Sequence, residues 1–94
     1  MKWFTYILLC NDNSYYVGHT QDIQQRVQTH NDGQEADYTA KRKPVKLVYK
    51  EELQSKPDAI AREVQIKKWS KAKKQSLIKG DVEQLKILSK CRNF

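Results

Sequence analysis

The sequence predicts an α+β domain in which a small three-stranded sheet is flanked by helices, in the order ββαβααα. Two short apolar segments joined by a turn open the chain, a third lies near its middle, and helix caps with apolar residues at helical spacing follow. With 94 residues, 38% of them hydrophobic, the chain suffices for one core and not for two. We therefore expect a single domain over 1–94, with its core at about 3–80.

The first two segments predict a β-hairpin. Residues 3–10 are rich in aromatic and branched side chains without strict alternation, which favours a strand covered on both faces. Residues 11–14 form a polar turn cluster, and residues 15–20 have the pattern of the returning strand. We expect the small sheet to be mixed or antiparallel.

A helix and a third strand follow the hairpin. Thr20 or Asp22 can cap a helix that runs to about residue 31. Residues 33–44 mix Gly, Asp, Lys and Arg with little apolar content, which indicates a mobile basic loop. Residues 45–49 then have the composition of a strand.

Three further helices are predicted in the second half. Ser55, followed two residues later by a proline, starts a helix that continues to Trp69. Ser70 caps a second, shorter helix. Asp81 begins a capping-box pattern for a last helix over 81–90.

The charge of the chain favours a polyanionic partner. Eighteen Lys and Arg against eleven Asp and Glu give a net charge of +7 and a pI near 9.5. Such an excess is typical of proteins that contact nucleic acid, although a soluble surface rich in lysine has the same composition. No seam on the predicted helices indicates an oligomeric state.

The two cysteines and the short apolar run near the N-terminus indicate the redox state and the location of the protein. Cys10 and Cys91 are too few for a disulfide framework and lack the paired spacing of a zinc site, so we expect reduced thiols. The apolar run over 3–10 is too short for a signal peptide or a membrane span. We expect a cytoplasmic protein without membrane contact.

Glu63 is the least expected residue on the predicted helices. Taking Ala59 as the origin of a helical wheel, Glu63 lies at about 40° and Ile66 at about −20°. Ile60 and Val64 lie at about 100° and 140°, so the carboxylate falls within an apolar stripe. Burying it is costly unless a cation, a metal ion or hydrogen-bond donors compensate.

Two interpretations of Glu63 stay open at this point. The simpler is a buried ion pair, with Arg62 turned inward or with Arg26. The other is a carboxylate that binds a metal ion.

Arg26 and His30 form a second candidate pair on the first predicted helix. Ile23, Val27 and His30 share one stripe, and Arg26 lies at its edge. Four residues apart, Arg26 could hold a phosphate bidentately and His30 could donate to it or transfer a proton. The alternatives are a solvated arginine and a histidine at the core edge with a satisfied nitrogen.

Tyrosines of the predicted hairpin are the third kind of candidate residue, after Glu63 and the Arg26–His30 pair. Tyr6, Tyr15 and Tyr16 lie in the predicted hairpin, where such rings usually serve packing. Combined with an arginine, a histidine and a carboxylate, they provide what metal-dependent phosphodiester cleavage requires. Those requirements are activation of water, neutralisation of charge at phosphorus and a metal ion that polarises the leaving oxygen.

The order and spacing of five positions resemble the GIY-YIG nuclease superfamily, and the short chain looks most like the small stand-alone bacterial proteins of the UPF0213 group. The resemblance covers about residues 3–80. The positions are Tyr6, Tyr16 within Tyr16-Val17-Gly18, Arg26, His30 and Glu63.

This resemblance implies a role for each position. Tyr6 belongs to the first signature, and Tyr16 of the second would act as general base or orient the attacking water. Arg26 would hold the scissile phosphate, and His30 would assist there. Glu63 would be the single protein ligand of one Mg²⁺ or Mn²⁺, with water and phosphate oxygens completing the shell.

The chain departs from the family pattern at two places. The first signature reads Phe4-Thr5-Tyr6 in place of Gly-Ile-Tyr. His19 stands where several relatives have a lysine that supports the base, and a neutral imidazole would do so differently. Many relatives also carry an asparagine on a later helix, for which this sequence shows no clear counterpart.

Two basic clusters are available for phosphate contacts, although each is also typical of a solvated surface. Contacts to the backbone would give preference for shape with little reading of bases. The clusters are Lys41, Arg42 and Lys43 in the predicted loop, and Lys67, Lys68, Lys71, Lys73 and Lys74 on the helices.

Three hypotheses of function follow. The first is a structure- or damage-directed endonuclease that cuts DNA with one metal ion. The second is a nucleic-acid-binding module that retains the fold with little cleavage, which the changes at positions 5 and 19 favour. The third is an interaction protein whose basic helices bind an acidic partner.

Overall fold

The computed structural model describes residues 2–32 and 41–80. Its three strands, β1 (Trp3–Leu9), β2 (Tyr15–Thr20) and β3 (Lys46–Leu53), form one antiparallel sheet. The strand order is β2-β1-β3, so β1 is central and the other two strands are edges. The predicted hairpin and the antiparallel alternative for the sheet are therefore confirmed.

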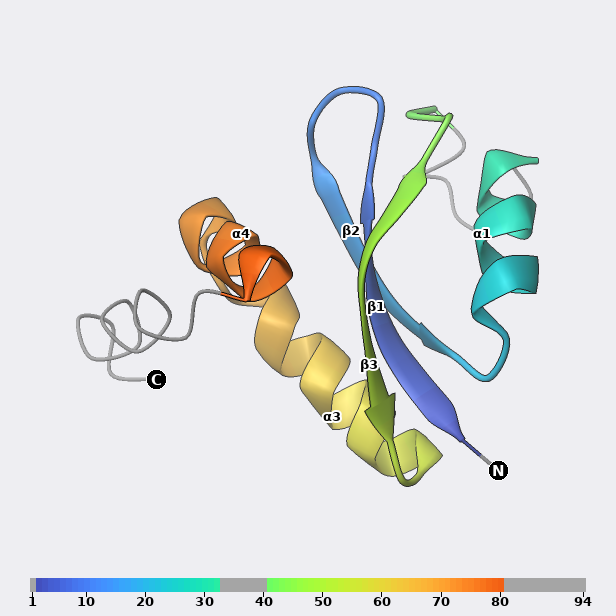
Figure 1. Ribbon diagram of the computed structural model, residues 1–94, viewed down its shortest axis with the longest axis vertical. Coiled ribbons are helices and arrows are strands. Elements are labelled where there is room, and N and C mark those ends of the chain that lie inside the picture. Colours follow the sequence, from blue (N-terminus) through green and yellow to red (C-terminus); the bar gives the residue numbers. More distant parts are fainter. Residues whose placement is uncertain (1, 33–40, 81–94) are drawn as a thin grey trace.

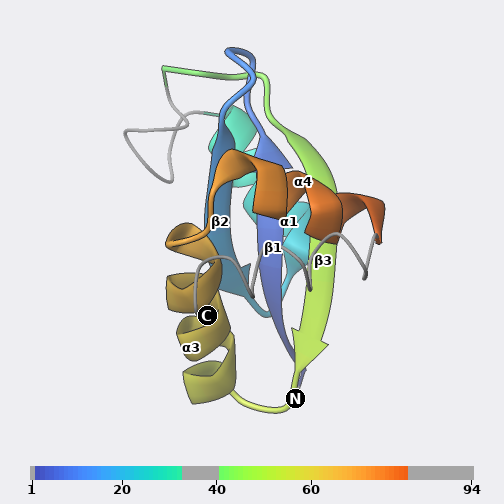
Figure 2. The ribbon, with the colours of Figure 1, turned by 90° about the vertical axis from the view of Figure 1, so that its left-hand side faces the viewer.

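Helices cover both faces of this sheet (Figure 1). One face carries α1 (Ile23–Asn31), and the other carries α3 (Lys56–Lys67) and α4 (Lys71–Lys79). Seen from the side, α3 lies along β2 while α4 crosses over β1 and β3 (Figure 2). The described order ββαβαα confirms the predicted α+β fold, and the helix predicted over 81–90 lies outside the described residues.

Local signals begin these helices at the predicted caps, whereas α3 ends at Lys67, two residues before the predicted end at Trp69. The side chain of Asp22 accepts from Gln25 N at 3.1 Å, and Ser55 and Ser70 cap α3 and α4 in the same way. Gly80 ends α4 with φ of 74°, a left-handed conformation in which glycine replaces a strained side chain. The hydrogen bonds of the three capping side chains satisfy backbone N–H groups that the start of a helix leaves without partners.

The central strand divides the core into two layers. Tyr6 and Leu8 pack on the α1 face, whereas Ile7 packs on the opposite face with Ile66 and Trp69. Successive side chains of a strand point to opposite faces, which explains why β1 lacks polar alternation. The prediction of a strand covered on both sides is confirmed.

The third strand is longer than predicted. It was expected over 45–49 and runs from Lys46 to Leu53, because Lys50, Glu51 and Glu52 extend it. An edge strand tolerates charged side chains that a central strand would exclude. Glu51 also has partners, since Arg62 Nε lies 3.1 Å from its carboxylate and the Tyr49 hydroxyl donates to it at 2.6 Å.

The buried face of α3 is narrower than the helical wheel predicted. Ala59 and Ile66 are fully buried, whereas Ile60 and Val64 are 38% and 45% exposed. The prediction of a broad apolar stripe is therefore wrong, because the helix rests on the sheet along one line only. Glu63 borders this line and does not interrupt a stripe.

Thr5 fixes the position of α3 on the sheet. It is fully buried, and its hydroxyl donates to the carbonyl oxygen of Ala59, in the first turn of α3, at 2.8 Å. The hydroxyl provides a directional contact that an apolar side chain would lack.

Removing that hydroxyl is expected to destabilise the fold modestly. Thr5→Val keeps the shape of the side chain and should lower the free energy of unfolding by about 1 kcal/mol, the net value of one hydrogen bond. Urea denaturation of both proteins measures the difference. An unchanged midpoint would show that the contact to Ala59 adds nothing to stability.

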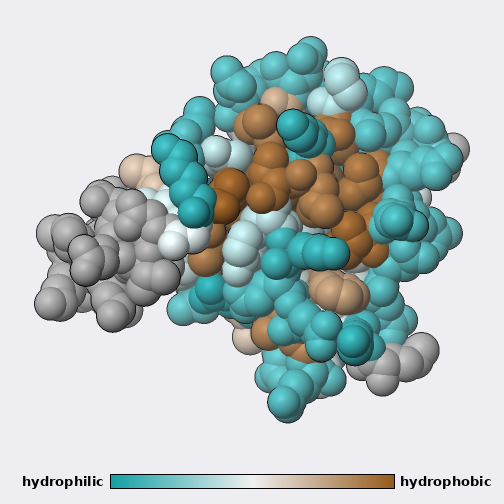
Figure 3. All heavy atoms as spheres, viewed as in Figure 1, coloured by the Kyte–Doolittle hydropathy of each residue, from teal (hydrophilic) through white to brown (hydrophobic). Residues whose placement is uncertain are grey.

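The edge formed by β3 leaves both core layers partly open. Figure 3 views this side of the molecule, where apolar side chains gather between polar ones. Partly buried residues of both layers include Leu47, Val48, Leu77 and Ile78. Within the described part of the chain, no helix has the length and apolar character needed to cross a membrane.

Candidate nuclease site

Because Gly18 has no side chain, the phenol ring of Tyr6 can lie across the neighbouring strand β2. The two residues are paired in the β1–β2 register, and the phenol of Tyr6 lies directly over the glycine. A Cβ atom added to Gly18 would lie 2.5 Å from the Tyr6 hydroxyl and 2.7 Å from Cζ. The glycine of the second signature thus provides space for the tyrosine of the first.

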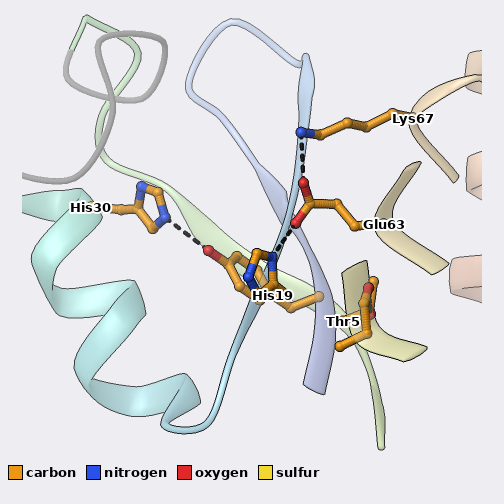
Figure 4. A network of polar contacts seen from close by, with 7 residues as sticks. Thr5, His19, His30, Glu63 and Lys67 are labelled. Carbon is orange, nitrogen blue, oxygen red and sulfur yellow. Dashed lines mark hydrogen bonds and ion pairs between the residues drawn. The ribbon is translucent and has the colours of Figure 1, made fainter. Parts of the chain in front are cut away.

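The hydroxyl of Tyr6 reaches the imidazole of His30, and Figure 4 labels this histidine and marks its hydrogen bond with a dashed line. Tyr6 Oη and His30 Nε2 are 3.0 Å apart and share a hydrogen bond between fully buried groups. The ring of Tyr16 meets the imidazole edge to face, with centroids 4.9 Å apart. Only Tyr16 of these three side chains is partly exposed.

Burial limits what His30 can do in this conformation. Its side chain is fully buried, and one ring nitrogen is bonded to Tyr6. This arrangement matches the alternative of a satisfied histidine at the core edge. A role of His30 at a phosphate stays a prediction, while its packing against Tyr16 is observed.

Glu63 lies on the other side of the hairpin, between two basic groups (Figure 4). His19 Nδ1 is 2.7 Å from Oε1 of the carboxylate, and Lys67 Nζ is 2.7 Å from Oε2. The Glu63 side chain is 14% exposed, so these contacts form where water only partly screens charge. The ring of Trp3 lies 5.9 Å from the imidazole of His19.

These contacts revise the expected ion pair of Glu63. The sequence suggested Arg62 or Arg26, but the carboxylate contacts His19 and Lys67. Arg62 instead contacts Glu51 and lies over the ring of Trp69, so it ties α3 to β3.

The candidate residues therefore form two groups on the two faces of β2. Tyr16 and His19 are three residues apart in a strand, so their side chains point to opposite faces. Tyr15 likewise packs with the layer under α3 and α4, away from Tyr16. Within residues 2–32 and 41–80, β2 is an edge strand, so each group lies beside one face of a strand that pairs on one side only. His19 contacts the carboxylate of Glu63 and lies on the face away from Tyr16.

Arg26 lies on α1, one turn before His30, and is partly buried. This places its backbone on the same helix flank as the Tyr6–His30 pair. The predicted proximity of Arg26 and His30 along the helix is thus consistent with α1.

The donors around Glu63 fit one weakly enclosed divalent ion. A carboxylate oxygen and an imidazole nitrogen are both metal ligands, and the carboxylate already attracts positive charge. No three His, Cys, Asp or Glu side chains gather within residues 2–32 and 41–80. Water and phosphate oxygens would have to complete the shell, as is usual for Mg²⁺.

The structure changes the account of the helical lysine cluster. Lys68 and Lys71 are exposed at the turn between α3 and α4. Lys73 is only 1% exposed, and its ammonium lies 4.1 Å from the centre of the Trp69 ring, so the prediction that it faces solvent is wrong. Its long apolar stem can cover the core while the charge rests on the ring. Burial also lowers the pKa of Lys74.

The predicted loop cluster is divided in a similar way. Lys41 and Lys43 are exposed, whereas Arg42 Nε is 2.8 Å from the Asp12 carboxylate at the hairpin turn. A hollow of about 500 Å³ lies there, lined by Asn11, Asp12, Lys41 and Arg42. It is lined by none of the candidate residues around β2, so it carries no argument about their chemistry.

Besides the His19–Glu63 and Tyr6–His30 contacts, sequence reasoning missed those of Lys67 and Thr5. Lys67 was assigned to phosphate binding alone, although its spacing of four residues from Glu63 is typical of a helical ion pair. The Thr5 hydroxyl has no such signal, because its partner is a backbone carbonyl 54 residues away. Cys10 is a buried free cysteine, and desolvation raises the pKa of its thiol. Cys91 lies outside the described residues, so the expectation of reduced thiols stays a prediction.

Comparison with known proteins decides the family. Residues 2–76, most of the chain, match the family described as the GIY-YIG catalytic domain. The chain belongs to the GIY-YIG family. This membership places it in a nuclease superfamily and implies interaction with nucleic acid.

Similar GIY-YIG sequences are named UPF0213 proteins. One from Bacillus velezensis is 45% identical over 75 residues, covering 80% of this chain and 76% of the relative. One from Staphylococcus aureus is 47% identical over 76 residues, covering 81% and 93%. The predicted resemblance to this group is confirmed.

Two solution NMR structures share the GIY-YIG fold of this chain. The UPF0213 protein of Bacillus halodurans is 38% identical with a TM-score of 0.54, and the comparison covers 84% of each chain. A protein from E. faecalis is 35% identical with a TM-score of 0.58, covering 87% and 88%.

Proposed function

We propose that this GIY-YIG protein is a metal-dependent endonuclease that hydrolyses phosphodiester bonds in DNA and selects targets by structure or damage. The observation that carries the proposal is the arrangement around β2. Partly exposed Tyr16 lies on one face of this edge strand, and Glu63, held by His19 and Lys67, lies beside the other. A phosphate at the free edge of the strand could meet both.

Each residue then has a task in hydrolysis. The oxygen of water bonds to phosphorus, the bond from phosphorus to a sugar oxygen breaks, and that oxygen takes up a proton. Tyr16 would orient the water or accept its proton, and Arg26 would offset the charge that develops on the phosphate. Glu63 would hold one Mg²⁺ or Mn²⁺, which when bound polarises the leaving oxygen.

The buried pair of Tyr6 and His30 would position Tyr16. His30 meets the Tyr16 ring edge to face, and its nitrogen is held by the Tyr6 hydroxyl. A ring supported on one side in this way keeps its hydroxyl in one place.

Cleavage by paired tyrosine variants tests the proposal. Supercoiled plasmid and branched DNA are incubated with Mg²⁺ or Mn²⁺ and with the intact protein, Tyr16→Phe or Tyr15→Phe. We expect nicking by the intact protein and by Tyr15→Phe, whose altered ring lies on the other face. Tyr16→Phe should lose about 10²-fold or more in rate, the usual contribution of a general base.

A binding module without efficient cleavage is the second candidate. The complete burial of His30 and its bond to Tyr6 favour it, because neither group reaches solvent in this conformation. DNA binding without cleavage of any substrate by the intact protein would decide for this function.

The exposed lysines at the turn between α3 and α4 give a further prediction. Lys68→Ala and Lys71→Ala should each weaken DNA binding and reduce the slope of log K against log salt by about 1, the effect of losing one phosphate contact. Fluorescence anisotropy at several salt concentrations measures this slope. Lys50→Ala, an exposed lysine on the opposite edge strand, is the matched control. Equal slopes for all three variants would exclude a defined contact at the turn.

A further inference from the structure

His19 and Glu63 are placed as two ligands of one metal ion would be. Nδ1 of the imidazole and Oε1 of the carboxylate are 2.7 Å apart. Adjacent donors around an octahedral ion with bonds of about 2.1 Å lie about 3 Å apart. A small separation of the two side chains would therefore convert the hydrogen bond into a pair of ligands.

The surroundings hold both donors in place. His19 pairs across the sheet with Thr5, whose buried hydroxyl bonds to α3 one helical turn before Glu63. The ring of Trp3 lies beside the imidazole. The other oxygen of the carboxylate is taken by Lys67, which orients the group and leaves Oε1 toward His19.

Access to the pair is also retained. The side chain of His19 is 29% exposed and that of Glu63 is 14% exposed, so an ion can reach them from solvent. His19 lies on the edge strand β2 and Glu63 reaches it from α3, so phosphate oxygens and water can supply further ligands from solvent.

We propose that His19 is a second protein ligand, beside Glu63, of the divalent ion in the proposed function. An imidazole nitrogen binds Co²⁺ and Ni²⁺ better than it binds Mg²⁺, whereas carboxylate and water suit Mg²⁺ and Mn²⁺. The site of this chain therefore favours ions that accept nitrogen. A lysine at position 19 would instead bring an ammonium group, which has no lone pair for a metal.

Pulsed electron paramagnetic resonance of Mn²⁺ bound to the full chain tests this ligand directly. We expect a coupling to ¹⁴N in the unmodified protein, its replacement by a ¹⁵N coupling when histidine is isotopically labelled, and its loss in His19→Gln. His30→Gln is the matched control, since the chain has only two histidines and His30 is bonded to Tyr6. Where His19→Gln fails to fold, the labelled unmodified chain still shows whether a histidine nitrogen binds the ion, and persistence of the coupling in His30→Gln then assigns it to His19.

Metal preference supplies a second measurement. Calorimetric titration with Co²⁺ and with Mg²⁺ should show that His19→Gln lowers the affinity for Co²⁺ by at least about tenfold relative to Mg²⁺. Tenfold is the lower end of the loss in metal affinity that mutations around a metal site cause.

The outcomes separate this inference from the function on which it rests. Bound Mn²⁺ without nitrogen coupling, in a protein that cleaves DNA, would overturn the role of His19 and leave the nuclease in place. Mn²⁺ that does not bind, in a protein that cleaves nothing, would overturn both. Nitrogen coupling that persists in His19→Gln would also exclude His19.

Discussion

Replacing Glu63 with glutamine is expected to lower the rate of metal-dependent DNA cleavage by about 10²- to 10³-fold, the loss that follows removal of one electrostatic group from a transition state. The amide keeps the size of the side chain but loses the charge that holds a divalent ion. Cleavage rates with Mg²⁺ and Mn²⁺ measure the effect.

The fold should survive this change. Glu63 borders the buried line of α3, and Ala59 and Ile66, which form that line, are untouched. Glu52→Gln is the matched control, because Glu52 lies on an exposed part of β3, where its carboxylate forms a surface ion pair with Lys2 at 3.6 Å. An unchanged cleavage rate in Glu63→Gln would remove the carboxylate from the proposed site.

Gly18→Ala is expected to be the more damaging change for stability. The new Cβ would lie 2.7 Å from Cζ of Tyr6, a residue that is only 1% exposed, so its aromatic ring would have to shift within the core. Overpacking of this kind costs about 1–3 kcal/mol, and each kcal/mol lowers the Tm of a domain of this size by about 4–8 °C. Thermal denaturation followed by circular dichroism measures the shift.

A double-mutant cycle identifies the cause of that loss. In a Tyr6→Leu background the ring is absent, so Gly18→Ala should cost much less. The same penalty in both backgrounds would show that Tyr6 is not what Gly18 accommodates. Gly80→Ala is an informative contrast, because apart from Gly80 and its chain neighbours no atom of residues 2–32 and 41–80 lies within 4 Å of a Cβ added at Gly80, and its positive φ is what opposes a side chain.

The sequence predicted those parts of the fold that depend on neighbouring residues. Asp22, Ser55 and Ser70 cap their helices through hydrogen bonds to residues three positions on, so the signal and its effect lie together. The end of β3 was missed because it depends on the place of the strand in the sheet, which neighbouring residues do not indicate. Charged residues normally indicate a loop, and only the position of β3 at the sheet edge makes them acceptable.

The candidate site was predicted in its members and not in its contacts. The pairs Tyr6–His30 and His19–Glu63 join residues 24 and 44 positions apart, and no local pattern encodes such distances. Lys73 illustrates a different limit. A run of lysines predicts a solvated face, but a nearby tryptophan ring can hold one ammonium inside the fold.

The opposite orientations of Tyr16 and His19 make the length of β2 as important as its composition. One residue inserted between them would turn one of the two side chains to the wrong face, even if every original residue were kept. The same insertion in the turn over 11–14 would leave both orientations intact. The tolerance of this hairpin to insertions should therefore change abruptly at the start of the strand, a constraint that single substitutions cannot reveal.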